Sequence, residues 1–453
     1  MNNKVLFSLI ILLSSVVILW NISTGSLMSW DECLYGQVSR EMYRSGNWMD
    51  LTWMGKPWCD KPPLYMWVTV LFFKLFGITE LSVRLFSSLC GIGTVGVVYL
   101  LAQKLYSRNA AITSALFLLT TWHFIWSSKI GMLDAAFTFF VTLSIYWFMV
   151  GEEKSIFLTY ALLAFAAAFL TKGITALIIP VIILAYMIAA KKMFLVTRRT
   201  FIVGMVVAVI AIGIWHAVAL MHYGRQFTYD YFIRHLFVRT TQVLEGHAGT
   251  GAWSSYLEAI PNKGRPWGGF GLFMMIVAGW RVLIKKEKNH LLPLLWAMVV
   301  LVLFSLAKTK NHWYIIPIYP AFALMLGWGA SRLFKGYAVA AVAMLTLSAL
   351  IYLSFEKRIF KLDYSPEAKR MALSVKAQLP QHEKVYLYRM SDPGMLFYFG
   401  DVFEDIPENR IKQLLSEPNR YIAMERNTLS SLGPFRYAFA AQSKDFVVVK
   451  TQP

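Results

Sequence analysis

Charged residues are scarce in this sequence. Only 15% of its 453 residues are Asp, Glu, Lys or Arg, whereas soluble globular proteins usually have about 25%. Hydrophobic residues make up 57% of the chain, and aromatic residues, which are common where a membrane meets water, make up 15%. This composition excludes an ordinary soluble protein and indicates one whose solvent is the lipid bilayer.

Cysteines are also few. The three of them, Cys33, Cys59 and Cys90, cannot form a disulfide framework. Cys33 and Cys59 fall in one predicted external loop and could pair in an oxidising compartment or remain free thiols, whereas Cys90 is expected to be a small apolar residue of a helix. The sequence also lacks a zinc-type Cys/His spacing, a Walker loop, a Rossmann fingerprint and a Gly-X-Ser-X-Gly elbow. Nucleotide-driven and serine-hydrolase chemistry therefore lose support.

Acidic residues number 25 against 44 Lys and Arg, which gives a formal net charge of +19. Such a charge is found in nucleic-acid-binding proteins, but here the basic residues stand in short clusters between apolar runs rather than on one soluble domain. Membrane topology explains most of them. We therefore expect membrane lipids, and no nucleic acid, among the partners.

Long apolar runs are abundant instead. Each helical crossing of the hydrocarbon layer needs about 20 apolar residues, and about eleven such spans can be placed. They lie near residues 5–22, 81–102, 110–127, 132–150, 156–171, 173–190, 200–222, 267–284, 290–307, 313–331 and 337–354. A further apolar stretch, Pro62–Phe76, contains Lys74 and is expected to be an interfacial or re-entrant helix. The fold class is thus an all-α polytopic membrane protein.

The basic clusters predict the orientation of these spans, because short cytoplasmic loops are enriched in Lys and Arg. With the N-terminus inside, four clusters fall on the cytoplasmic side: Lys104/Arg108, Lys191/Lys192/Arg198/Arg199, Arg281/Lys285/Lys286/Lys288 and Arg332/Lys335. The same alternation places the loops of about 22–79 and 223–267, and everything after about 355, outside. We expect a multi-pass protein of the bacterial inner membrane whose working face is periplasmic.

The composition changes after residue 354. Residues 355–453 mix polar and apolar positions, with a helix-like stretch at 365–379 and strand-like runs at 384–388, 420–424 and 445–449. We therefore divide the chain into a membrane domain, 1–354, and a small α/β external domain, 355–453.

Several ionisable residues fall near the external ends of the spans. Asp31 and Glu32 follow the first span directly, and Lys61 stands before two prolines that stiffen its backbone. Asp134 and Lys172 lie at external helix boundaries, where an ionisable residue is expensive and usually functional. Each also has a plain structural interpretation: the acids could cap helices, and Lys61 could bind lipid headgroups.

Positive charge on the external side is higher than the topology requires. Arg234, Arg239, Lys308 and Lys310 fall there, and such donors favour phosphate groups. A solvated loop helix is the alternative for the stretch that holds Arg234 and Arg239. Asp31, Glu32 and Asp60 could supply oxygen ligands to a divalent metal ion.

Short motifs in a fixed order then resemble the lipid A aminoarabinose transferases and their protein O-mannosyltransferase relatives. They are Trp30-Asp31-Glu32, Arg40-Glu41-Met42 with Ser45-Gly46-Asn47-Trp48, Lys61-Pro62-Pro63-Leu64-Tyr65, Arg84-Leu85, Leu133-Asp134, Thr171-Lys172-Gly173, and Lys308-Thr309-Lys310 followed by Tyr314, Pro317 and Tyr319-Pro320. The resemblance covers most of the membrane domain. One departure is Asp60, where relatives commonly have Glu before Lys-Pro-Pro.

This resemblance implies a GT-C glycosyltransferase that uses a polyprenyl-phosphate sugar, of undecaprenyl-phosphate type, with inversion at the anomeric carbon. It implies catalysis or acceptor positioning by Asp31 and Asp134, with Glu32 beside them. The implied donor-phosphate ligands are Lys61, Tyr65, Arg234, Arg239, Lys308, Lys310 and Tyr314, with Lys172 and His312 as further candidates and Asp60 as a metal ligand. No cofactor beyond that metal ion is expected.

The expected acceptor is lipid A, another envelope glycan or a protein, and the enzyme is expected to be a monomer. Two alternatives remain open, a transporter or flippase for a lipid-linked or anionic substrate and a protein O-glycosyltransferase. A transporter should concentrate ionisable residues at mid-membrane between repeats, whereas here they gather at one external face.

Overall fold

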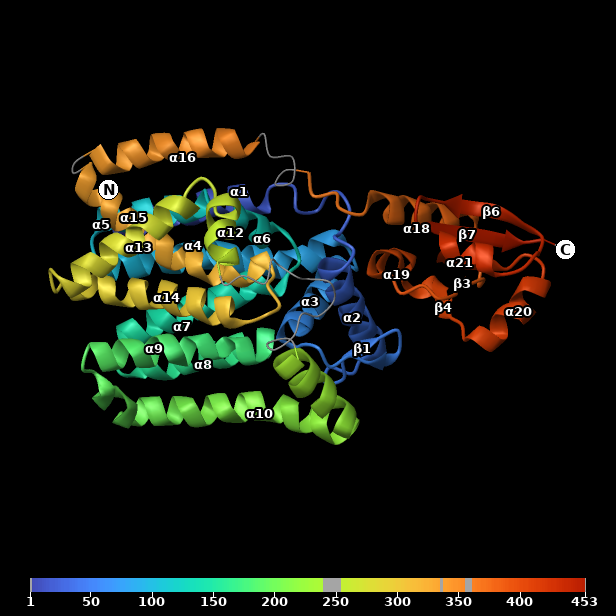
Figure 1. Ribbon diagram of the computed structural model, residues 1–453, viewed down its shortest axis with the longest axis horizontal. Coiled ribbons are helices and arrows are strands. Elements are labelled where there is room, and N and C mark those ends of the chain that lie inside the picture. The colour runs from blue at the N-terminus through green and yellow to red at the C-terminus, as the bar shows by residue number, and fades with distance from the viewer. Residues whose placement is uncertain (1, 239–253, 335–336, 355–360, 453) are drawn as a thin grey trace.

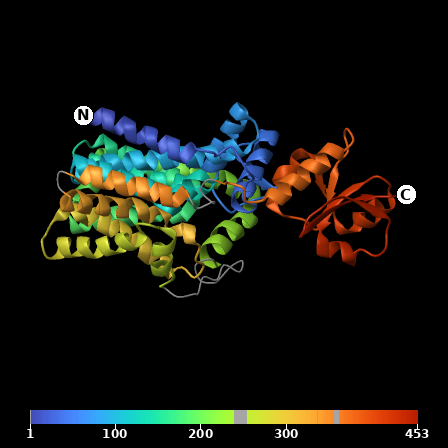
Figure 2. The same cartoon turned by 90° about the horizontal axis from the view of Figure 1, so that it is seen from above.

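The computed structural model describes residues 2–238, 254–334, 337–354 and 361–452 (Figure 1). A long bundle of helices forms one part, and a smaller domain with a β-sheet lies beyond one end of that bundle. Figure 2 shows the same arrangement from a second side. The expected combination of a helical membrane part and a small C-terminal α/β part is confirmed.

The bundle consists of apolar helices that run along its length (Figure 1). They are α1 (Asn3–Leu19), α4 (Glu80–Leu105), α5 (Arg108–Leu119), α6 (Trp122–Lys129), α7 (Leu133–Gly151), α8 (Ile156–Lys172), α9 (Ile178–Ala189), α10 (Arg199–Phe227), α13 (Gly268–Leu283), α14 (Leu291–Leu306), α15 (Tyr319–Leu333) and α16 (Ala338–Ser354). Within the described residues, six helical stretches are long and apolar enough to cross a membrane, or seven if the bent pair α5–α6 is one span. The count of about eleven spans stays a prediction.

One of the six stretches, Ile156–Ala189, reverses its direction. Lys172, at the end of α8, pairs with Asp134 in the first turn of α7, whereas Lys192, beyond α9, pairs with Glu152 just past the other end of α7 at 2.7 Å. The chain therefore ascends in α8 and returns in α9. Gly173, with φ 63° and ψ −142°, makes this reversal, which a residue with a Cβ adopts only under strain.

The stretch expected as one span at 110–127 is instead two helices, α5 and α6, bent by 67°. The hydroxyls of Thr120 and Thr121 donate to the carbonyls of Leu116 and Phe117, four residues earlier, a pattern that often bends helices. The N–H of Trp122 donates to the carbonyl of Arg265 rather than to the preceding turn. The bend places α6 at the same end of the bundle as the start of α7.

Packing differs strongly between helices. In the apolar part of the stretch His312–Leu333, which contains α15, 83% of the residues are buried, whereas in that of Arg199–Arg234, which contains α10, only 17% are. Close approach is made possible by small residues: a Cβ on Gly327 of α15 would lie 2.0 Å from the hydroxyl oxygen of Ser114 of α5. The helix α15 is thus central, and α10 presents most of its apolar surface outward, as a lipid-facing helix does.

Two short helices cover the end of the bundle where α7 begins. These are α2 (Asp31–Ser45) and α3 (Leu64–Phe76), joined by the small hairpin of β1 (Thr52–Trp53) and β2 (Lys56–Pro57). The later external segment contributes a π-helical stretch, Thr228–Val238, and α12 (Ser255–Lys263). The expected interfacial helices of the first external loop are confirmed.

The C-terminal domain is built on a five-stranded sheet of order β4-β3-β5-β7-β6. Its strands are β3 (Val385–Leu387), β4 (Phe403–Asp405), β5 (Tyr421–Glu425), β6 (Tyr437–Gln442) and β7 (Phe446–Thr451), and its helices are α18 (Pro366–Gln378), α19 (Pro393–Phe399), α20 (Glu408–Ser416) and α21 (Arg426–Ser431). The strand β3 is parallel to β4 and β5, and β7 is antiparallel to β5 and β6. The stretches expected as a helix and strands at 365–379, 384–388, 420–424 and 445–449 are α18, β3, β5 and β7.

This domain packs directly on α2. The guanidinium of Arg40 lies 4.6 Å from the centre of the Phe397 ring and donates to the Phe397 carbonyl at 2.7 Å. The hydroxyl of Tyr398 accepts from the Leu27 N–H at 2.7 Å. The sheet domain is therefore fastened to the helix whose first residue is Asp31.

Candidate active site

Four ionisable side chains meet at the covered end of the bundle, each from a different element. Asp31 begins α2, Lys61 precedes α3, Asp134 lies in the first turn of α7, and Lys172 ends α8. Charge interactions connect Asp31 with the other three. The structure thus brings two acids and two cations together where four chain segments end.

Asp134 and Lys172 form an ion pair that is almost fully buried, with 4% and 7% of their side chains exposed. The ammonium of Lys172 lies 4.8 Å from the centre of the Tyr314 ring and 5.5 Å from that of Phe137. Aromatic faces stabilise a cation at such distances. Tyr314, predicted from its motif, therefore belongs to this group.

Asp31 is only partly buried, and its carboxylate accepts a hydrogen bond from Tyr35, one turn along α2, at 3.2 Å. Burial, followed by the neighbouring Asp134 charge, raises the pKa of Asp31 to about 6, while Tyr35, Lys61 and Lys172 oppose this rise. A carboxyl group with such a pKa changes its charge close to neutral pH. That property suits a general base.

Lys61 is held by its own loop. Its ammonium donates to the carbonyl of Asp60 at 3.1 Å, and the side chain is partly buried. Its charge acts on both Asp31 and Asp134. With Pro62 and Pro63 directly behind it, this cation has a defined place beside the two acids.

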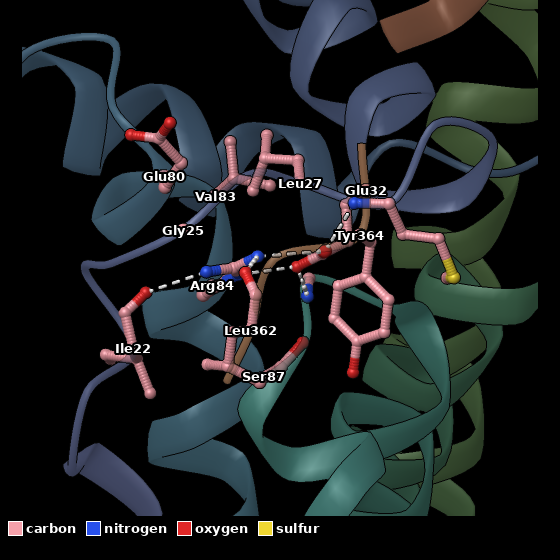
Figure 3. Close-up of polar contacts among 12 residues, drawn as sticks. Ile22, Gly25, Leu27, Glu32, Glu80, Val83, Arg84, Ser87, Leu362 and Tyr364 are labelled. Carbon is pink, nitrogen blue, oxygen red and sulfur yellow. Dashed lines mark hydrogen bonds and ion pairs between the residues drawn. The ribbon is translucent and has the colours of Figure 1, made fainter. Parts of the chain in front are cut away.

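Glu32 does not join this group, which argues against the predicted catalytic role. Its side chain is completely buried and pairs with Arg84 of α4 at 2.8 Å (Figure 3). The reason lies in the helix geometry: adjacent residues of α2 point about 100° apart, so Asp31 and Glu32 face different surroundings.

Two predicted phosphate ligands also point elsewhere. The Tyr65 hydroxyl donates to the Val83 carbonyl at 3.1 Å and lies 2.8 Å from the Ser87 hydroxyl, both in α4. The Lys310 ammonium donates to the carbonyls of Ser305 and Ala307, which end α14. Tyr65 and Lys310 therefore fasten helices and do not face the acids.

The remaining predicted residues are placed differently. Arg234 and Lys308 are exposed, and Arg239 lies outside the described residues. The ring nitrogen Nδ1 of His312 lies 3.0 Å from Nε2 of His123, whose Nδ1 is 2.9 Å from the Tyr319 hydroxyl. Thus His312 belongs to a histidine pair at the bend between α5 and α6, and His123 is a member that the sequence reasoning missed.

Two further residues were missed, Arg84 and Tyr35. Arg84 stands in one of the short motifs, but its role became visible only through its partners. Tyr35 lies four residues after Asp31, a spacing that brings side chains together on a helix. That spacing was the available signal for Tyr35.

Among the residues that the structure describes, no three His, Cys, Asp or Glu side chains are grouped so that they could hold a metal ion. The assignment of Asp60 as a metal ligand stays a prediction. The cysteines Cys33, Cys59 and Cys90 are all free and buried. Cys33 and Cys59 are therefore not paired in this structure.

The chain is similar to known proteins over much of its length. The family described as dolichyl-phosphate-mannose-protein mannosyltransferase matches residues 60–216. An undecaprenyl phosphate-alpha-4-amino-4-deoxy-L-arabinose arabinosyl transferase of Pseudomonas fluorescens is 29% identical over 73% of this chain and 60% of its own length. The namesake protein of Edwardsiella ictaluri is 30% identical over 67% of this chain and 55% of its own length.

The fold has a close counterpart among solved structures. ArnT from Cupriavidus metallidurans, bound to undecaprenyl phosphate, superimposes with a TM-score of 0.81 at 19% identity, covering 98% of this chain and 97% of that one. The chain therefore shares the fold of this protein and is similar in sequence to the arabinosyl transferases. This likeness to glycosyltransferases favours an enzyme over the transporter alternative.

Proposed function

We propose that this GT-C enzyme moves a sugar from an undecaprenyl-phosphate-type carrier to lipid A on the periplasmic face of the inner membrane. The observation that carries the proposal is the group of Asp31, Asp134, Lys61 and Lys172 at one covered end of a membrane bundle. The names of the arabinosyl transferase relatives support the donor, and the resemblance of the sequence motifs to lipid A aminoarabinose transferases supports the acceptor.

The orientation is supported by the basic residues at the other end of the bundle. Lys104 pairs with Glu153 at 2.6 Å, and Lys192 with Glu152 at 2.7 Å. The Arg281 guanidinium lies 5.1 Å from the centre of the Trp328 ring. Such clusters favour the cytoplasmic side, so the end with the two acids faces the periplasm.

The reaction we propose is a direct displacement. An oxygen of the acceptor attacks the anomeric carbon while the bond from that carbon to the phosphate oxygen breaks, and the carrier phosphate leaves with the bonding electrons. Lys61 stabilises the negative charge that grows on the phosphate. Asp31 accepts the proton when the attacking group is a hydroxyl, and Asp134, held by Lys172, positions the sugar or acceptor.

A protein acceptor is the second candidate, since the matching family is described as a protein mannosyltransferase. That match spans residues 60–216, whereas the arabinosyl transferase matches extend over 67% and 73% of the chain. The longer matches favour lipid A.

The proposal is tested with the purified full chain in detergent. Undecaprenyl-phosphate-linked aminoarabinose is the donor, and lipid A or a synthetic peptide is the acceptor. We expect transfer to lipid A and a loss of about 10²-fold or more in kcat/KM for D31N and D134N. The matched control is D401N, which removes an exposed acid that pairs with Arg44. Full activity of both site variants would defeat the site assignment, and transfer to the peptide alone would replace the acceptor.

A further inference from the structure

The buried arginine next to the site has an unusually complete set of partners. Arg84 has no exposed side-chain surface, and its three guanidinium nitrogens all donate (Figure 3). Two bonds go to the carboxylate of Glu32, at 2.8 and 3.3 Å. The others go to four backbone carbonyls, those of Ile22, Thr24, Ser26 and Leu362, at 2.8 to 3.2 Å. One side chain therefore ties the end of the first span and the entry to the C-terminal domain to α4.

The partner carboxylate is equally occupied. Its Oε2 accepts from the Met28 N–H at 2.8 Å and its Oε1 from the Gly131 N–H at 2.7 Å, in addition to Arg84. Each oxygen of Glu32 thus receives one backbone donor and one guanidinium donor. Glu32 adjoins Asp31 in α2, and Gly131 stands three residues before Asp134 in the turn that leads into α7.

We infer that Glu32 and Arg84 are positioning residues: their shared ion pair sets the separation of Asp31 and Asp134. The ion pair fixes the start of α2 through Glu32 and the start of α7 through Gly131. A fully buried ion pair is costly to desolvate and is weak evidence for stability. Its bonds instead give a defined register to the two helix starts that carry the acids. The inference deepens the proposed function and rests on it.

A change in this separation has a visible consequence. The charges that act on Asp31 come from Asp134 of α7, Lys61 before α3 and Lys172 of α8, together with the Tyr35 hydroxyl of its own helix. When the α2 and α7 starts shift relative to each other, the balance of these charges changes. The pH dependence of the rate then moves, which general loss of folded protein does not cause.

The variant E32Q tests the inference sharply. Both oxygens of Glu32 accept from a backbone N–H and from Arg84, so either orientation of a glutamine amide places its NH₂ against donors. The matched control is E80Q in α4, the helix of Arg84, which removes a 2.6 Å ion pair to Lys369 without contacting the start of α2 or α7. In the donor-to-lipid A assay we expect E32Q to lower kcat by about tenfold or more, to leave the donor KM unchanged, and to move the acidic limb of the pH profile. E80Q keeps the wild-type kcat and profile.

Should E32Q fail to fold, R84K takes its place, because it retains the buried positive charge with fewer and differently directed donors. A wild-type kcat and pH profile in the folded variant would overturn the inference. The inference would also be overturned if kcat fell only in proportion to the fraction of folded protein while the pH profile stayed unchanged. If the wild-type enzyme transfers the sugar to lipid A and D31N and D134N are inactive in the same assay, the proposed function survives that result; if the wild-type enzyme transfers no sugar, the proposed function itself fails.

Discussion

Asp31 differs from an ordinary surface carboxyl group because burial and the Asp134 charge raise its pKa to about 6. In its proposed role as general base Asp31 must be ionised, so the rate is expected to fall as the pH drops through 6 rather than near pH 4, where free Asp titrates. Tyr35 lowers this pKa through its hydrogen bond. Y35F therefore moves the acidic limb of kcat/KM to higher pH.

The pH profile is measured on the purified enzyme with the same donor and acceptor. Y43F, two turns further along α2, is the control, because Tyr43 packs in the apolar surroundings of the helix. An acidic limb that stays in place in Y35F would contradict the assignment of Asp31 as the titrating base.

The motifs supplied the members of the site that gather, namely Asp31, Lys61, Asp134, Lys172 and Tyr314. They could not separate Asp31 from Glu32, because which neighbour faces the site depends on where α2 begins. Nor could they show that the Lys310 ammonium donates to the backbone carbonyls at the end of α14. Side-chain direction follows from tertiary packing, and a list of residue types does not contain it.

Among the elements, the reversal between α8 and α9 places Lys172. A Cβ on Gly173 would lie 2.6 Å from the Tyr231 hydroxyl, and φ is +63°. We expect G173A to destabilise the protein by about 1–3 kcal/mol and to weaken transfer by displacing Lys172. Thermal unfolding in detergent measures the first effect and kcat the second.

The control is G213A in α10, where a Cβ would meet no atom within 4 Å. Because Ala favours helices over Gly by about 1 kcal/mol, G213A is expected to be neutral or stabilising. Equal losses in both variants would mean that the reversal has no special role.

The positions and lengths of the apolar runs predicted most helices to within a few residues, but they missed the break at Thr120. That break depends on the Arg265 carbonyl, which lies far along the chain.

In the C-terminal domain, β3, β5 and β7 were expected, whereas β4 and β6 were not. The strand β4 has three residues, among them Glu404 and Asp405, and it is a strand through its pairing with β3 rather than through its composition.

For the whole molecule, the question is how the C-terminal domain is fastened to the membrane part. Arg40 is buried, with 8% exposed, and bonds to the Phe397 carbonyl. Arg44 and Asp401 form an exposed ion pair, with 59% and 50% of their side chains accessible. We expect R40A to cost about 1.5–3 kcal/mol and R44A less than about 1 kcal/mol, both measured by thermal unfolding of the full chain. Similar losses of stability in the two variants would show that the exposed ion pair holds the domain as firmly as the buried arginine does.

The Arg84 network also bears on how the protein is made. The last carbonyl that Arg84 binds, that of Leu362, stands 278 residues later in the chain. During synthesis this arginine enters the edge of the membrane long before that partner exists, and its charge must meanwhile be satisfied by Glu32, the early carbonyls or water. The hydrogen-bond set of Arg84 is therefore complete only after α16, the helix that precedes Leu362, has been synthesised.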